Sequence, residues 1–221
     1  MKLSILITFS FMLVLGSFKQ AYSQKYDADF QVEAGINFGG IWNMIRSNSY
    51  DSFQYNNNYN LSCKVILNKY AIRSGVGLRF DQDQSKKAEL LDVISTNYRN
   101  LNLRLGVERQ FDLEGKWLIY GGIDGVFSYF RNFVSEDSGF DQLIRVKERN
   151  TYGAALVSGI QFHIIPRLVI ATEVSFQYQI YYETEQLTFD VFSDFNGPLN
   201  ENSGSKFLFL SPNVLYLSYK F

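Results

Sequence analysis

Eight stretches of the chain alternate between apolar and polar residues with a period of two. They cover residues 29–43, 59–68, 70–81, 97–111, 117–130, 150–163, 168–182 and 205–221. In a β-strand successive side chains point to opposite faces, so each stretch has one face suited to apolar surroundings and one suited to polar surroundings. The clearest is 168–182, where Val174, Phe176 and Tyr178 alternate with Glu173 and Gln177. The sequence therefore predicts an all-β chain with eight strands.

The lengths and spacing of these segments indicate what their apolar faces contact. Most of the segments have about 10 to 15 residues, whereas strands of soluble proteins have about 5–6 and strands that cross a bilayer need about 9–11. The connections alternate between short ones (69, 112–116, 164–167) and long ones (44–58, 82–96, 131–149, 183–204). Short periplasmic turns, long external loops and an even strand count are typical of outer-membrane barrels. We expect an eight-stranded antiparallel up-and-down transmembrane β-barrel with its apolar faces toward lipid. The alternative, a soluble lipocalin-like barrel, requires eight unusually long strands.

The composition excludes several classes of protein. Lys plus Arg is 21 and Asp plus Glu is 22, and this near-neutral balance argues against a nucleic-acid-binding protein. A single cysteine, Cys63, excludes both an internal disulfide framework and a cysteine-based zinc site. We therefore expect no metal and no cofactor.

The N-terminus has the pattern of a secretory signal. Lys2 precedes an apolar run from Leu3 to Phe18, and small residues at Ala21 and Ser23 fit a cleavage site. The run is shorter than the roughly 20 residues of a membrane-spanning helix, which argues against the alternative of an N-terminal anchor. We expect a signal peptide at 1–23 and an exported barrel domain at 24–221.

The last segment carries the most specific motif of the chain. Leu215, Leu217, Tyr219 and the terminal Phe221 alternate along it, and they resemble the carboxy-terminal signal that the barrel-insertion machinery recognises. With the strand pattern over 24–221, the chain resembles the small eight-stranded outer-membrane barrels of Gram-negative bacteria, the OmpX, OmpA-barrel and PorT-like group. The resemblance implies residence in the cell outer membrane, contact with outer-membrane lipid and assembly by that machinery. Its PorT-like side implies involvement in protein secretion.

The polar faces carry charges of both signs, which we expect to point into the lumen. The basic ones are Lys64, Arg73, Arg79, Arg104 and Lys220, and the acidic ones are Asp29, Glu33, Glu108, Asp124 and Glu173. An unpaired charge in a narrow lumen is costly, so these residues predict a neutral, salt-bridged, structural plug and argue against a wide pore.

Aromatic residues near the segment ends fit girdles at the two membrane interfaces. We place Tyr70, Phe111 and Trp117 at the periplasmic girdle, and Trp42, Tyr59, Tyr129 and Tyr182 at the external one.

No catalytic motif stands out in the sequence. The single histidine, His163, precedes the short turn at Pro166, on the side opposite to an outer-leaflet active site, so we expect no enzyme. Function is better placed in the loops, which carry recognition on rigid scaffolds. Phe189, Phe192 and Phe195 form a candidate docking surface, although they could equally pack on neighbouring loops. Within 82–96, the stretch 86–94 could form a short amphipathic helix.

These observations favour an outer-membrane barrel with a structural or loop-mediated binding role, as an accessory subunit of an envelope or secretion assembly. Two alternatives remain open: an outer-leaflet lipid-modifying enzyme and a narrow small-solute channel.

Overall fold

The computed structural model describes residues 30–37, 59–86, 93–113, 115–137, 142–189, 197–210 and 215–221. These residues form nine strands, β1 (Phe30–Asn37), β2 (Leu61–Leu67), β3 (Tyr70–Lys86), β4 (Val93–Asp112), β5 (Trp117–Asp137), β6 (Gln142–Ile165), β7 (Leu168–Phe189), β8 (Asn200–Leu210) and β9 (Tyr216–Lys220). Within these ranges the structure contains no helix of the length and apolarity needed to cross a membrane. The predicted signal peptide (1–23) and the predicted loop at 44–58 lie outside the described residues.

The strands form one antiparallel sheet that closes on itself. Each strand from β1 to β7 pairs with its neighbours in the chain, and the sheet closes because β9 pairs with both β1 and β7. β8 and β9 pair with successive parts of β7, at Ser175↔Leu210 and Ala171↔Tyr216. They are therefore two pieces of one barrel strand, with residues 211–215 between them in the sequence. The predicted eight-stranded up-and-down barrel is confirmed, with its last strand divided.

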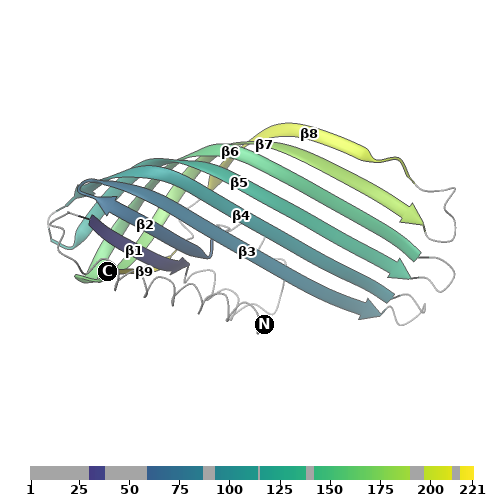
Figure 1. Ribbon diagram of the computed structural model, residues 1–221, viewed down its shortest axis with the longest axis horizontal. Coiled ribbons are helices and arrows are strands. Elements are labelled where there is room, and N and C mark those ends of the chain that lie inside the picture. Colours follow the sequence, from purple (N-terminus) through teal and green to yellow (C-terminus); the bar gives the residue numbers. More distant parts are fainter. Residues whose placement is uncertain are drawn as a thin grey trace.

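The three short turns lie at the same end of the barrel as the start of β1 and the end of β9 (Figure 1). The β2–β3 turn contains Asn68 at φ 56°, a left-handed conformation that asparagine tolerates better than most residues. The β4–β5 turn contains Gly115 at φ 83°, where a side chain would be strained. The three predicted short turns therefore lie together at one end of the barrel, which we call the short-turn end.

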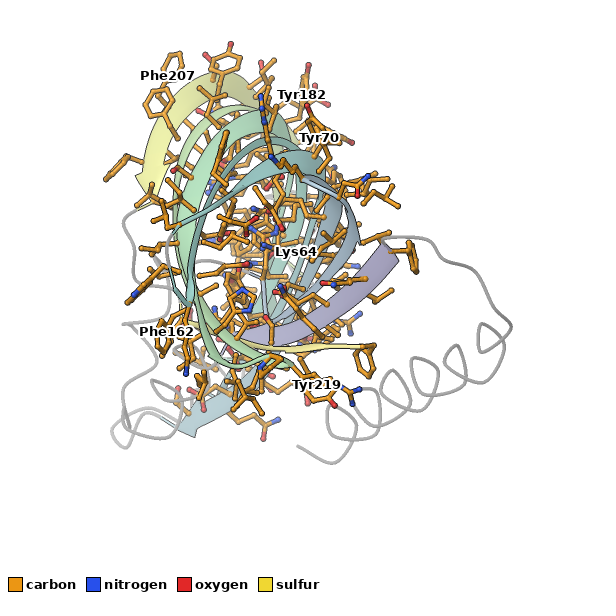
Figure 2. The ribbon with its side chains drawn as sticks, turned by 90° about the vertical axis from the view of Figure 1, so that its left-hand side faces the viewer. Lys64, Tyr70, Phe162, Tyr182, Phe207 and Tyr219 are labelled. Carbon is orange, nitrogen blue, oxygen red and sulfur yellow. The ribbon has the colours of Figure 1, made fainter. Side chains whose placement is uncertain are left out.

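Most of the side chains inside the ring are polar, with a smaller set of buried apolar residues such as Leu118, Val126 and Val157, and apolar side chains cover the outside of the ring. In Figure 2, Lys64 points into the centre, whereas Tyr70, Tyr182, Phe207 and Tyr219 point outward. Outward apolar residues remain exposed, such as Leu105 at 64%, whereas Arg73 and Asp124 inside the ring are each only 1% exposed. This is the reverse of a soluble protein, in which charged residues are almost never fully buried.

The outward apolar residues form a continuous band, which we call the apolar belt. On β3 the belt runs from Tyr70 to Phe80 before Gln82, and on β4 it runs from Val107 to Leu101 before Arg99, with Arg109 and Phe111 at its short-turn edge. On the other long strands it runs over 117–129, 152–162 and 168–182. A tilted strand of this length covers a height of about 25 Å, which is the height of the apolar band of transmembrane barrels.

The long strands continue past the belt and form a curved sheet there. This outer sheet consists of β3 81–86, β4 93–100, β5 130–137, β6 142–151, β7 183–189 and β8 200–206. Figure 1 shows β3 to β8 projecting far beyond the shorter β1, β2 and β9.

The outer sheet corrects the predicted boundaries of three long loops. Most of 82–96, 131–149 and 183–204 is paired strand. Beyond a bilayer both faces of a strand can meet water, so the alternation stops although the backbone pairing continues. Lys86, Val93 and Ile94 are strand residues, which is contrary to a helix over 86–94; residues 87–92 lie outside the described residues.

The aromatic girdles are mostly found where they were predicted, with one correction. Tyr70, Phe111 and Trp117 are exposed near the short turns, and Tyr182 is exposed at the far edge of the belt. Tyr59 is instead 6% exposed and lies inside the ring. It precedes β2, and the bend at Asn60 breaks the alternation on which its placement was based. Trp42 lies outside the described residues.

The belt predicts where on one strand a charge destabilises the protein. We expect Val174→Arg, an outward position of β7 within the belt, to lower the free energy of unfolding by about 2–4 kcal/mol in lipid vesicles, because the charge must enter hydrocarbon. Gln186→Arg, on the same face of the same strand in the outer sheet, is expected to change it by less than about 0.5 kcal/mol. Urea unfolding followed by tryptophan fluorescence measures both. Equal losses in the two variants would contradict the position of the belt.

Candidate functional site

Six charged side chains from five strands meet inside the ring, and we call them the ion cluster. They are Lys64 on β2, Arg73 on β3, Arg104 and Glu108 on β4, Asp124 on β5 and Glu173 on β7. All six are less than 9% exposed. The cluster contains three cations and three carboxylates and is therefore neutral.

Arg73 holds the cluster together because it contacts all three carboxylates. Its guanidinium donates hydrogen bonds to Glu108 at 3.1 Å and to Glu173 at 2.6 Å. Its Nε lies 3.2 Å from Asp124 Oδ1, without the alignment of a hydrogen bond. Lys64 Nζ adds a bond of 2.9 Å to the first of these carboxylates, Glu108. The cluster thus links β2, β3, β4, β5 and β7 across the lumen.

Arg104 connects the cluster to the last strand. It donates a hydrogen bond to Glu173, and its Nη2 donates another to the Tyr216 hydroxyl at 3.1 Å. Its guanidinium also lies 4.6 Å from the centre of the Tyr59 ring. Tyr120 completes the group, because its hydroxyl donates a hydrogen bond of 3.2 Å to Glu173 Oε2. Buried charges that are paired and hydrogen-bonded in this way avoid the cost of an isolated charge.

Glycines make room for these large side chains. A Cβ on Gly75 would lie 2.5 Å from Arg104 Nε, and one on Gly159 would lie 2.3 Å from the Tyr120 ring. The arginine and the tyrosine therefore lie directly over the backbone of neighbouring strands. This packing explains why an eight-stranded ring, which is just wide enough for side chains to fill, can be filled by arginine and tyrosine.

The structure brings together most, but not all, of the residues predicted to face the lumen. Glu33 on β1 and Lys220 on β9 are also buried, and Glu33 is the cross-strand partner of both Lys220 and Lys64. Arg79 does not join the cluster; its side chain is 27% exposed and pairs with Asp81 at 2.6 Å. Asp29 lies outside the described residues. Sequence reasoning did not single out Tyr120 and Tyr216, although both lie on the polar faces of their segments.

The inner face of the outer sheet carries a second, more exposed set of charges. Glu183 accepts hydrogen bonds from Lys147 and Arg149, with the lysine at 2.8 Å. Partial burial alone would raise the pKa of Glu183, but the hydrogen bonds from these two cations outweigh it and hold the pKa below its ordinary value of 4.5. Lys206 on β8 faces the same side, and partial burial near Arg149 lowers its pKa. On this polar inner face the positive charges lie on β6 and β8, and Glu183 and Glu185 on β7 partly balance them.

The remaining predicted positions lie in different places. Leu215 and Tyr219 are exposed on the outside of the ring, and Leu217 lies between them on the same face. Phe221 is 45% exposed beside them. Phe189 is the last residue of β7, and Phe192 and Phe195 lie outside the described residues.

His163 lies at the short-turn end, in the wall of an open cavity of about 420 Å³ that is lined by residues 112–113, 115–118 and 163–166. Within the described ranges no cluster of three His, Cys, Asp or Glu side chains could hold a metal ion.

The comparisons with known proteins concern the fold. A scan of protein families finds no match to this chain, and a search of curated proteins finds none either. Among solved structures, a major outer membrane protein from Thermus thermophilus is similar, with a TM-score of 0.51 and 14% sequence identity over 89% of this chain and 100% of that one. At this identity the likeness shows the fold. The chain thus has the β-barrel fold of an outer membrane protein.

The ion cluster predicts a strong dependence of stability on its acidic members. We expect Glu173→Gln to lower the free energy of unfolding by about 3–5 kcal/mol, because it leaves Arg73 and Arg104 buried with too little negative charge. Glu185→Gln on the same strand removes a carboxylate whose nearest cation lies 3.8 Å away in an exposed pair, and it is expected to cost less than about 1 kcal/mol. Urea unfolding in detergent micelles compares the two. A small loss for Glu173→Gln would show that the cluster contributes little to stability.

Proposed function

We propose that this protein is an outer-membrane β-barrel with a closed lumen, which uses its outer sheet to bind a polar ligand or an envelope protein and has no enzymatic activity. The observation that carries the proposal is the ion cluster. Its side chains reach across the ring from five strands and are almost completely buried, so they fill the path that a solute would need.

The apolar belt supports the membrane location. A soluble protein of this size rarely exposes a continuous apolar surface, and large exposed patches mark contacts with membranes or partners. The belt begins beside the short turns and extends along the outward face of β3 to β7. Its height fits a bilayer, and the short-turn end then faces the periplasm.

The outer sheet supports a binding role. It extends from the barrel on six long strands, so it presents a surface on a rigid scaffold. Its inner face combines the cations Lys147, Arg149 and Lys206 with the Phe130 ring, which lies 5.9 Å from the Arg149 guanidinium. The Tyr181 ring, just before this part of β7, lies 5.5 Å from the same guanidinium. Cations and aromatic rings are typical of surfaces that recognise polar or anionic groups. The single histidine lies at the opposite end, which favours binding over catalysis at the outer leaflet.

The closed lumen predicts an absence of channel activity. We expect purified protein in planar lipid bilayers to show no stable single-channel conductance at neutral pH, because the ion cluster blocks the ring. A wide porin reconstituted in the same way serves as the positive control. Stable conductance steps from this protein would favour the alternative of a narrow solute channel.

The binding role predicts that the inner face of β8, and not its outer face, contributes to binding of the partner. Tagged protein is recovered from native outer membranes in mild detergent, and its partners are identified by mass spectrometry. We expect a stoichiometric partner whose recovery falls several-fold with Lys206→Glu, on the inner face, because the change reverses the charge that faces the partner. Glu201→Lys reverses a charge on the outer face of the same strand and is expected to leave recovery unchanged. Equal recovery with both variants would contradict binding at the inner face, and recovery of the protein from the soluble periplasm would contradict the membrane location.

A further inference from the structure

Two arginines stand directly opposite each other on the outside of the sheet. Arg99 on β4 and Arg131 on β5 are cross-strand partners. Each lies two residues beyond an outward residue of the apolar belt, Leu101 and Tyr129 respectively, and therefore points outward as well. Like charges directly opposite each other destabilise a sheet, so this pair calls for a physical reason.

The described neighbours relieve this repulsion only in part. Glu148 on β6 lies 3.1 Å from Arg131 Nε, in a pair whose two side chains are 43% and 37% exposed. Arg99 is exposed, and its Nε donates only a long bond of 3.4 Å to the Asn97 amide oxygen. Among the described residues no carboxylate lies within 4 Å of Arg99, so the three charged groups together carry a net positive charge.

The pair lies at the level of the lipid headgroups. Two residues along a strand correspond to about 7 Å, so each guanidinium lies just past the last apolar row of the belt. Below the pair, Leu101 and Tyr129 face each other, and Leu103 and Phe127 form the next row. An apolar track therefore descends along the belt directly from the two cations.

We infer that Arg99 and Arg131 bind the phosphate group of a lipid in the outer leaflet, whose acyl chains lie along this track. A phosphate between the two guanidinium groups accepts charge-assisted hydrogen bonds from both and removes their repulsion. The track favours a lipid over free phosphate, because free phosphate has no apolar part that could contact an apolar surface. Glu148 is the one carboxylate beside the site among the described residues, and it competes with the phosphate for Arg131.

Native mass spectrometry of the full chain in detergent tests the site. The probes are diphosphorylated lipid A, the same lipid without its phosphates, and inorganic phosphate. We expect retention of the phosphorylated lipid, and a loss of affinity of about tenfold for each of Arg99→Gln and Arg131→Gln. Glu148→Gln is expected to increase retention, because it removes the competing carboxylate. Arg109→Gln, an outward arginine at the other end of β4, is expected to leave retention unchanged.

Three outcomes would overturn the inference. The first is equal retention of the phosphorylated and the phosphate-free lipid, and the second is unchanged retention in the double variant Arg99→Gln/Arg131→Gln. The third is binding of inorganic phosphate without retention of the lipid, which would identify a free-anion site. The inference rests on the proposed outer-membrane location. Fractionation separates the two, because protein recovered from the outer membrane with any of these outcomes refutes the lipid site alone.

Discussion

The pairing of β9 with β1 is the contact on which the rest of the structure depends. It joins Glu33 to Lys220 and Asn37 to Tyr216, and it converts an open sheet into a ring at the short-turn end. A bilayer offers no water to an unpaired strand edge, so only a closed sheet can satisfy its backbone there. The same contact places Tyr216 beside Arg104, and so it also completes the surroundings of the ion cluster.

The parity of each segment is enough to predict which face a residue occupies within the belt. Arg73, Glu108 and Glu173 all lie inside the ring, on the polar faces of their segments. Parity cannot give the partners, because Arg73 and Glu173 are 100 positions apart in the chain and meet only when the ring closes. It also fails where both faces of a strand are wet, which is why the outer sheet was predicted as loops, and where a bend interrupts the strand, as at Asn60 before Tyr59.

The two charged regions have different physical characters. In the ion cluster, burial makes each charge depend on its partners, so the cluster acts as a structural unit that fixes the strands around it. In the outer sheet the ion pair between Lys147 and Glu185 is partly exposed, and such pairs contribute little to stability. These outer charges can therefore change partners at small cost, which suits a surface that binds other molecules.

The division of the last strand affects the order in which the barrel can assemble. β9 reaches both β1 and β7, whereas β8 pairs with β7, and the two pieces are separated by 211–215. The backbone pairing from β3 to β7 joins only strands that are neighbours in the chain, and such local pairing forms early. Closure joins the first described strand to the last and must follow. Until then β1 presents an unpaired edge, and a partly assembled sheet with such an edge is prone to aggregate. Pairing of the terminal strand with β1 thus completes the barrel. Until that pairing forms, the exposed side chains on the outer face of β9 can be bound by a protein that brings β9 to the edge of β1.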